Sequence, residues 1–290
     1  MSATRDTTPI LLAGTTPALT VGAAGAAVQI PAGTLANPFN VPLEVRGLYL
    51  LQTAFVPNVI GPAGIGDVAL RAGRHDLTNG FCPVVALSPA YNSIGETWVT
   101  LVGGAPPTFN ASCHTRWIFD RPMILLPGAA VTGAFRVNPA LAEAVTMAGS
   151  TLSLTVVVHA RRLAAGAPTP RSGPIPFASG AWYVAVNTPI ANDLQLMNTL
   201  PIPLTVTKLI AMGLDLAQVA TGLTITGPGG MLGTPRRTVL EGDANSNFAQ
   251  CHSVEEAHTL NPGESYKAVI DVLNGAETAI SMIGYRTEAL

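Results

Sequence analysis

The stretch Val41-Pro-Leu-Glu-Val-Arg-Gly-Leu-Tyr-Leu50 decides the fold class of this chain. Leu43 and Val45 alternate with Glu44, which is the two-residue period of a strand with one buried and one solvated face. Residues 202–211 have the same character, and glycine and proline residues separate many such short runs. Short strands with frequent turn signals are typical of a sandwich or a barrel. The sequence therefore predicts an all-β protein.

An internal repeat divides the chain into two related halves. Pro42-Leu-Glu-Val45 matches Pro203-Leu-Thr-Val206, which lies 161 residues later. Four further matches occur in the same order, and their offsets fall from 165 to 125, as deletions in the second copy would produce. They join residues 9–13 with 174–178, 109–115 with 248–253, 126–137 with 261–272, and 158–161 with 283–286. Five collinear matches predict two copies of one β-unit.

The residues between the copies have the composition of a linker, because alanine, glycine, proline and serine dominate residues 164–174. We therefore expect two tandem jelly-roll-like β-sandwich domains related by internal duplication. Their expected bounds are 1–163 for the first domain, 164–173 for the linker, and 174–290 for the second, shorter domain.

The copies differ most near the end of the first one. A short helix is predicted there over residues 139–148, with Asn138 as its cap and Gly149 after its last residue. The second copy has Leu273-Asn-Gly275 at the matching place, and Asn-Gly favours a two-residue hairpin turn. We expect a helix in one copy to be replaced by a tight turn in the other.

The composition indicates a chain that partner chains cover. Charged residues make up 11% and hydrophobic residues 48% of the 290, against roughly 25% charged in a typical domain, and the mean hydropathy is +0.38. The longest uncharged stretch, residues 7–43, is broken by prolines, so no spanning helix is predicted. No basic segment followed by an apolar one begins the chain, which argues against a secretory signal. Partner chains explain the apolar surface better than a membrane does.

The charge balance argues against a nucleic-acid groove. The net charge is −2 and the isoelectric point is near 6.2, whereas such a groove needs clustered basic residues. The two basic doublets, Arg161-Arg162 and Arg236-Arg237, are interpreted as surface charge or as interface ion pairs.

The three cysteines, Cys82, Cys113 and Cys251, have neither metal-ligand spacing nor the even number of a disulfide framework, and we expect free thiols. His114 and His252 each follow a cysteine. Neighbours on a strand point to opposite faces, so neither pair can share a proton. The sequence predicts no catalytic residue, no cofactor site and no metal site.

Other site-like patterns have simpler interpretations. The glycine-rich residues 227–233 lack the Gly-Lys-Ser/Thr ending of a phosphate loop and are interpreted as a hairpin loop. Residues 61–66 lack the strand–helix context of a dinucleotide site. Glu255-Glu256, and Asp67 with His75-Asp76, lack the spacing of a calcium loop and are interpreted as solvated loop charge.

Three aromatic residues leave a binding function open. Trp117, Trp182 and Tyr183 could form a sugar-stacking platform. Aromatic residues are only 6% of the chain, which favours anchors in a core or an interface.

The run Arg116-Trp-Ile-Phe-Asp-Arg-Pro-Met-Ile-Leu-Leu-Pro-Gly128, followed by a last strand at residues 154–161, resembles small jelly-roll proteins of bacteriophage virions. The second half keeps Pro262-Gly263 and Arg286, but it has Glu255-Glu-Ala-His258 where the Arg-Pro pair would lie, so the likeness is weaker there. The resemblance covers about half of the chain and carries no catalytic residue with it.

Two such halves in one chain resemble two kinds of virion protein. One is the decoration or cement protein that binds a capsid, and the other is the double jelly-roll coat protein, whose two barrels per chain turn a trimer into a pseudo-hexagonal tile. We expect a non-enzymatic structural component of a bacteriophage virion. The capsid-associated decoration, cement or minor capsid role is favoured, and a shell-forming major capsid protein and a carbohydrate- or receptor-binding tail or fibre module are the alternatives. The expected partners are copies of itself and other virion proteins, in a virion that is assembled in the host cytoplasm.

Overall fold

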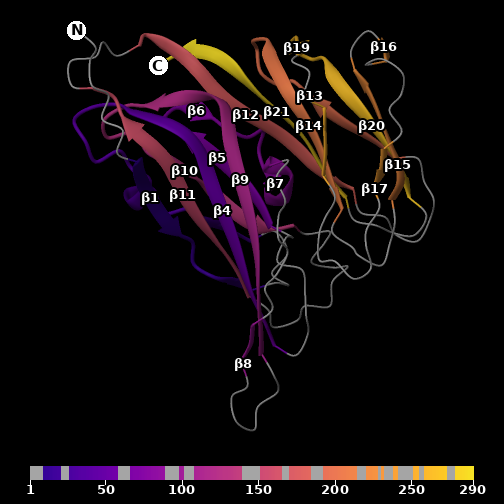
Figure 1. Cartoon of the computed structure of the whole chain (residues 1–290), viewed down its shortest axis with the longest axis horizontal. Coiled ribbons are helices and arrows are strands. Elements are labelled where there is room, and N and C mark those ends of the chain that lie inside the picture. Colours follow the sequence, from indigo (N-terminus) through magenta and orange to yellow (C-terminus); the bar gives the residue numbers. More distant parts are fainter. Residues whose placement is uncertain are drawn as a thin grey trace.

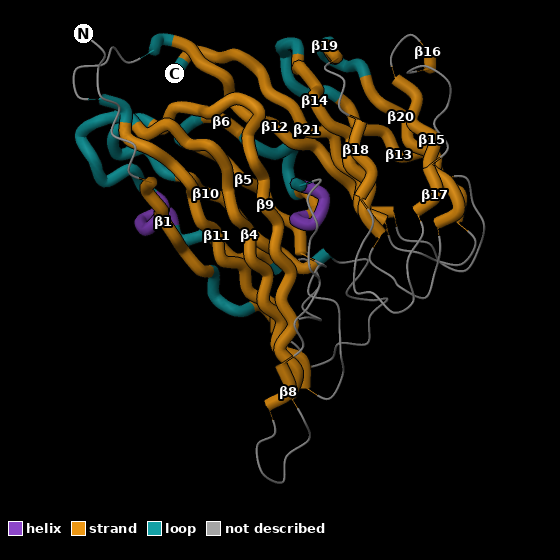
Figure 2. Tube along the Cα trace, viewed as in Figure 1, coloured by secondary structure: helices purple, strands orange, loops and turns teal. Residues whose placement is uncertain are grey.

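Strands dominate the structure, a computed structural model (Figures 1 and 2). Within the described residues, the 3-10 helices η1 (Ala32–Leu35) and η2 (Val84–Leu87) interrupt them. The all-β prediction is confirmed. The structure describes residues 9–20, 26–57, 66–88, 98–100, 108–138, 151–164, 170–183, 192–213, 220–227, 230–231, 238–240, 251–254, 258–272 and 278–290.

The first half is a roll of two antiparallel sheets. One sheet has the order β1-β11-β4-β9-β8 with β2 beside β11, and the other has the order β3-β10-β5-β6 with β7 beside β5. The chain passes back and forth between the two sheets, which is the wrapping of a jelly roll. The strands are β1 (Pro9–Thr15), β2 (Leu19–Thr20), β3 (Ala27–Gln29), β4 (Leu43–Pro57), β5 (Gly66–Ala72), β6 (His75–Asp76), β7 (Cys82–Pro83), β8 (Trp98–Thr100), β9 (Thr108–Leu125), β10 (Val131–Val137) and β11 (Thr151–Arg162).

The second half repeats this topology. Its sheets have the orders β12-β21-β14-β18 with β19 beside β14, and β13-β20-β15-β16 with β17 beside β15. Each strand takes the place of its counterpart in the first roll, so the predicted duplication holds for the fold. The strands are β12 (Ser172–Tyr183), β13 (Asn192–Met197), β14 (Leu204–Gly213), β15 (Ala220–Gly227), β16 (Gly230–Met231), β17 (Thr238–Leu240), β18 (Cys251–Val254), β19 (His258–Leu260), β20 (Ser265–Val272) and β21 (Thr278–Ala289).

The repeat extends to single hydrogen bonds. The side-chain amide of Asn37 donates to the carbonyls of Val41 at 3.0 Å and of Leu125 at 3.1 Å. Asn198, 161 residues later, makes the same two bonds at 3.0 Å and 2.9 Å. Both asparagines are buried, so each amide needs these partners. In each roll this side chain ties the start of one long strand to the strand beside it.

The strand registers correct three of the predicted matches by one or two residues. A bulge follows Val45 in β4 and Val206 in β14. The residues that pair with Val45 and Val206 are equivalent in the two rolls, so Ala160 corresponds to Gly284, one residue from the predicted match. Along the neighbouring strands Pro9 then corresponds to Pro176, and not to Pro174 as the sequence predicted. The third correction concerns the two cysteines, which are not at equivalent positions. Cys113 lies opposite Gln52, whereas Cys251 lies opposite Met212, the counterpart of Leu51. A short sequence match can be wrong by one residue without being noticed. A strand register cannot, because a shift of one residue moves every side chain to the opposite face of the sheet.

Some predictions fall outside the described residues. These are the helix over residues 139–148, the turn at 273–275 and residues 165–169 of the linker. For the glycine-rich residues 227–233, Gly227 pairs with Gly230 between antiparallel strands, so the expected hairpin is present. The domain bounds stay a prediction, with β11 ending at Arg162 and β12 beginning at Ser172.

Candidate functional site at the junction of the two rolls

The two rolls share one apolar core. In β11 buried and half-buried residues alternate, as expected for a sheet with one covered face. In β21, by contrast, every residue from Ala279 to Gly284 is buried. Ala279 and Ile283 join the core cluster of the first roll, together with Ile210 of β14. The sheet β12-β21-β14 is therefore covered on both faces, and one of the covers is the first roll. Figure 1 shows β12 and β21 between the first roll and the outer strands of the second.

Main-chain contacts bind the rolls directly. Thr78 forms a parallel bridge with Ala178 of β12, and the amide of Ala178 donates to the carbonyl of Leu77 at 2.9 Å. Farther along β12 the packing leaves no room for a side chain. A Cβ atom added to Gly180 would lie 2.7 Å from Sγ of Cys82. Segment 77–87 of the first roll, with β7 and η2, therefore lies on the second roll in backbone contact.

A buried carboxylate lies at the junction. Asp67 in β5 is 2% exposed, and its Oδ1 accepts a hydrogen bond of 2.7 Å from the indole N–H of Trp182 in β12. Its Oδ2 accepts bonds from Arg136 at 3.2 Å and Asn138 at 3.0 Å. Burial raises the pKa of Asp67 and outweighs the lowering by these three partners. The prediction of a solvated loop charge is wrong for Asp67, which lies on a strand between apolar residues.

A second polar cluster holds the ends of both rolls together. Nδ1 of His75 lies 2.9 Å from Oε2 of Glu288, and Arg286 pairs with the same carboxylate. Arg286 also donates to the carbonyl of Asp76 at 2.9 Å. Burial raises the pKa of Glu288, but the hydrogen bonds and charges of Arg286 and His75 outweigh it, so this pKa lies below its ordinary value. The solvated-charge interpretation is wrong for the buried His75 and correct for the exposed Asp76, which pairs with Arg71 at 2.8 Å.

A wide bulge of β9 forms the third contact. Residues 119–122 lie outside the β4–β9 register, between Ile118 and Met123. From this bulge Asp120 accepts hydrogen bonds from Nζ of Lys208 at 2.7 Å and from the hydroxyl of Thr207. The guanidinium of Arg121 lies 4.7 Å from the centre of the Tyr285 ring, in cation–π geometry.

Asp120 and Arg121 belong to the run Arg116–Gly128, which resembles phage jelly-roll proteins. The sequence predicted none of the three polar clusters at the junction. One signal was available for Asp67, because a lone carboxylate within an apolar strand must find partners when it is buried.

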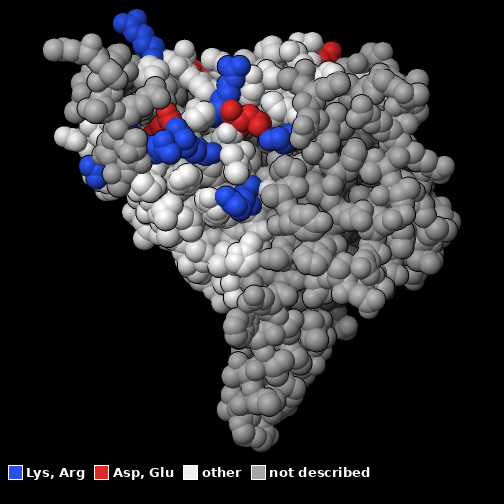
Figure 3. Space-filling view, viewed as in Figure 1, with Lys and Arg blue, Asp and Glu red and all other residues white. Residues whose placement is uncertain are grey.

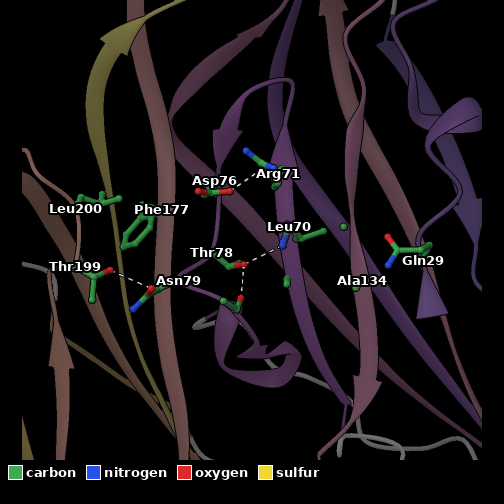
Figure 4. A pocket seen from close by; sticks show the side chains of 13 residues that line it. Gln29, Leu70, Arg71, Asp76, Thr78, Asn79, Ala134, Phe177, Thr199 and Leu200 are labelled. Atoms are coloured by element: carbon green, nitrogen blue, oxygen red, sulfur yellow. Dashed lines mark hydrogen bonds and ion pairs between the residues drawn. The ribbon is translucent and has the colours of Figure 1, made fainter. Parts of the chain in front are cut away.

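An open groove of about 480 Å³ lies beside the junction and is lined by both rolls (Figure 4). Several of its polar side chains bond to one another and to the main chain. The hydroxyl of Thr78 accepts from the amide of Leu70 at 2.9 Å and donates to the carbonyl of Gly80 at 2.8 Å. The hydroxyl of Thr199 donates to Asn79 at 3.0 Å. These bonds join the walls of the groove and do not converge on a point where a substrate atom could react.

The predicted site residues are not gathered into a reactive group. Cys82 and Cys113 are buried free thiols, and burial raises the pKa of Cys113 to about 12 and raises that of Cys82 as well. His114 is exposed, on the face opposite Cys113, as strand geometry predicts. Cys251 and His252 lie on β18, and nothing is described of their side chains. Among the residues that the structure describes, no three His, Cys, Asp or Glu side chains are placed to hold a metal ion, and no helix could cross a bilayer.

The described indoles, Trp117 and Trp182, are not placed for a sugar-stacking platform. Trp117 is 1% exposed and packs edge-to-face on Phe119 with ring centroids 5.2 Å apart. Trp182 is half-buried and its N–H is bonded to Asp67. Both indoles are anchors, one in the core and one at the junction, as their low number predicts. The side chain of Tyr183 is outside the described residues.

No family model matches the chain, and no curated protein matches its sequence. Among solved structures, the major capsid protein of Sulfolobus turreted icosahedral virus is similar with a TM-score of 0.51 and 11% identity, over 95% of this chain and 96% of that one. The fold is a double jelly roll. Other double jelly rolls match with lower scores, such as VP54 of PBCV-1 (TM-score 0.49, 9% identity, 97% and 94% covered) and P2 of bacteriophage PM2 (0.40, 11%, 96% and 98%). At such identities the likeness concerns the fold alone.

Proposed function

We propose that this chain is a non-enzymatic structural protein of a virion and that it forms the shell itself, as a double jelly-roll coat subunit. One observation carries the proposal: two jelly rolls of equal topology are held as one body by a shared core and three polar clusters. A rigid pair of similar rolls gives each chain two similar units in a fixed relative orientation. Three such chains would supply the six similar units that a pseudo-hexagonal capsid tile requires.

The fold likeness supports the shell-forming role over the capsid-associated role that the sequence favoured. It extends over 95% of this chain and 96% of a major capsid protein, so the two chains correspond from one roll to the other. Decoration or cementing of a shell is the second candidate, supported by the same apolar, weakly charged composition. The proposed partners are copies of this chain and other virion proteins, in a virion assembled in the host cytoplasm. A bacteriophage origin stays a prediction.

The test is the assembly state of the purified chain. Light scattering after size-exclusion chromatography should give a mass of two or more chains of 29.8 kDa each, and negative-stain images should show particles with six lobes, two for each of three chains. A monomer at every concentration would contradict self-assembly. A monomer that binds only to preformed shells would support the decoration role instead.

A further inference from the structure

One Asn-Gly pair lies where the first roll contacts the second. Asn79 and Gly80 belong to segment 77–87, and both are exposed along the groove beside the junction. The main-chain amide of Asn79 donates to the carbonyl of Ala178 in β12 at 2.8 Å. This pair of residues therefore belongs to the joint between the rolls, and it is open to water.

The sequence Asn-Gly allows the main chain to attack the side chain that precedes it. The main-chain nitrogen of the glycine can add to the side-chain carbonyl carbon of the asparagine and form a five-membered succinimide ring. Glycine has no side chain that hinders this approach. Asparagine is accordingly among the thermolabile residues that proteins of hyperthermophiles contain less often.

The main-chain nitrogen of Gly80 is available for this attack. Among the described residues no group accepts a hydrogen bond from it, so no bond has to break before it reacts. Gly80 has a φ of +62°, in the left-handed region, and apart from its chain neighbours no atom lies within 4 Å of the place of its missing Cβ. Its carbonyl accepts a hydrogen bond of 2.8 Å from the hydroxyl of Thr78. The nitrogen therefore lies in an uncrowded turn that a neighbouring side chain holds in place.

The side chain of Asn79 is activated from the other roll. The hydroxyl of Thr199 donates to Oδ1 of Asn79 at 3.0 Å, and Figure 4 shows the two side chains pointing toward each other. Negative charge develops on this oxygen when the nitrogen adds to the carbonyl, and a donor placed there lowers the barrier. The leaving nitrogen, Nδ2, donates to Oγ of Ser179 at 3.3 Å, a long and weak bond that costs little to lose.

A charge added at this place would be a substantial change. Figure 3 shows that charged side chains are few on the described surface and gather toward one end. Arg71, which lines the same groove, is already paired with Asp76 at 2.8 Å. Deamidation converts Asn79 into a carboxylate, which makes the formal net charge of the chain one unit more negative than −2. The joint between the rolls would then carry an additional anion.

We propose that Asn79-Gly80 is a site of self-modification, at which the folded chain deamidates and thereby changes one contact between its two rolls. A bond forms between the nitrogen of Gly80 and Cγ of Asn79, the bond from Cγ to Nδ2 breaks, and ammonia leaves. The amide proton passes to hydroxide, and the leaving nitrogen takes a proton from water. Water then opens the ring at either of its carbonyl carbons, which gives aspartate or isoaspartate.

The isoaspartate form alters the main chain as well as the charge. Its backbone runs through the former side chain and is one carbon atom longer, beside the bridge between Thr78 and Ala178. The side-chain bonds of Asn79 to Thr199 and Ser179 are lost in this form. The modification requires water alone and no assembly, so its test is independent of the proposed function.

The test is peptide mapping of the full chain during incubation in mildly alkaline buffer, in which the attacking amide loses its proton more readily. The peptide that contains Asn79 should gain about 1 Da, because an amide becomes a carboxyl group, and it should divide into aspartate and isoaspartate forms. Conversion should be at least as fast as in the chain unfolded in urea, because Thr199 activates only the folded site. Slower conversion of the folded chain would overturn the inference. Mapping separates this pair from Asn274-Gly275, the other Asn-Gly pair of the sequence.

Two variants identify the groups that act. Thr199→Val keeps the shape of the side chain without the donor and should convert at least about threefold more slowly, a smaller loss than that of an oxyanion donor in a closed active site. Gly80→Ala, whose methyl group crowds the attacking nitrogen, should convert at least about tenfold more slowly. The matched control is Thr15→Val, the same change at an exposed hydroxyl of β1, and it should convert like the wild type. Conversion of Thr199→Val or Gly80→Ala at the wild-type rate would overturn the inference.

The effect on the joint is measured on the converted chain itself. Ion-exchange chromatography separates converted chains by their additional negative charge, and differential scanning calorimetry compares them with unconverted ones. The melting temperature of the isoaspartate form should be lower by at least about 2 °C, as expected for lost hydrogen bonds in a chain of this size. An unchanged melting temperature would overturn the proposed change in the contact between the rolls.

Discussion

At the scale of single residues, the junction relies on polar side chains that are buried and partnered. Asp67 has three side-chain partners, and one of them, Trp182, belongs to the other roll. Glu288 is likewise shared between His75 of the first roll and Arg286 of the second. Asp67 and Arg286 are buried, and buried charges are costly unless they are paired, so these two clusters favour one relative placement of the rolls over others.

Trp182→Phe tests the indole bond across the junction. The variant keeps most of the ring volume but leaves Oδ1 of Asp67 without its 2.7 Å donor. We expect the free energy of unfolding to fall by about 1–3 kcal/mol, because an unsatisfied buried acceptor keeps its desolvation penalty. Urea unfolding followed by circular dichroism measures this. Tyr49→Phe, which removes a bond at a half-buried surface ring, should change it by less than about 0.5 kcal/mol, and equal effects would contradict the assignment.

Glu288 predicts a sensitivity to acid. Its pKa in the folded chain lies below the ordinary 4.5, so the folded state binds fewer protons than the unfolded one. The resulting stability is present above pH 4.5 and is lost as the pH falls through the lowered pKa. The melting temperature of the wild type should therefore exceed that of Glu288→Gln at pH 7, and the difference should shrink toward pH 3. A constant difference would show that the carboxylate charge is not involved.

Asp67 should show the opposite slope. Its folded pKa is raised above 3.8, so the folded state holds the proton longer and loses stability as the pH rises from 3.8 through the raised pKa. Relative to Asp67→Asn, the melting temperature of the wild type should fall across this range. A difference that rises instead would mean that Arg136 and Trp182 lower the pKa more than burial raises it.

At the scale of elements, β12 is the strand that joins the rolls. It pairs with β21 along its whole length, and Ala178 bridges to Thr78 of the first roll. This crowding explains Gly180, whose place a larger residue could not fill. The linker composition that precedes β12 gives no sign of it, because close approach depends on what packs against the strand.

Gly180→Ala should disrupt this element. The added methyl group would lie 2.7 Å from Sγ of Cys82 and 2.9 Å from the carbonyl oxygen of Ile280, so the two rolls must separate locally. We expect a loss of about 1–3 kcal/mol in the free energy of unfolding, as for other overpacked cores. Gly33→Ala, where no atom lies within 4 Å of the new Cβ, is the matched control. A Gly180→Ala chain as stable as the control would mean that the junction is looser than described.

At the scale of the whole molecule, the two rolls form one body. Ile210, Ala279 and Ile283 of the second roll belong to the apolar core of the first. Separation of the rolls would expose this surface together with segment 77–87, and the polar clusters would lose their partners. The low charge and high hydropathy of the chain then reflect both this internal junction and the proposed contacts between chains.

Unfolding of the chain, at a concentration where it is monomeric, should be a single transition. Because the core is shared, neither roll keeps its apolar cover when the other unfolds, so the calorimetric and van't Hoff enthalpies should agree. Differential scanning calorimetry measures both. Two resolved transitions, or a van't Hoff enthalpy near half of the calorimetric one, would contradict a shared core.

The sequence alone determined the class and plan of the fold. The alternation around Leu43 and Val45 predicts strands because it depends on neighbouring residues, and the collinear matches predict a duplicated unit because each of them compares short runs of sequence. The match between residues 42–45 and 203–206 proved correct to the residue at its bulge. The opposite faces of Cys113 and His114 also followed from a local pattern, whereas the low aromatic content of the whole chain favoured the anchoring role of Trp117.

The tertiary structure alone decided the registers and the junction. Asp67, Glu288 and Asp120 each have a partner in the other roll that lies more than 80 residues away in the chain. A carboxylate looks the same in a sequence whether it is solvated or paired, since its environment is set by distant residues. For the same reason only the structure distinguishes the covered face of the second roll from the equivalent face of the first, where Leu11 and Ile118 are exposed.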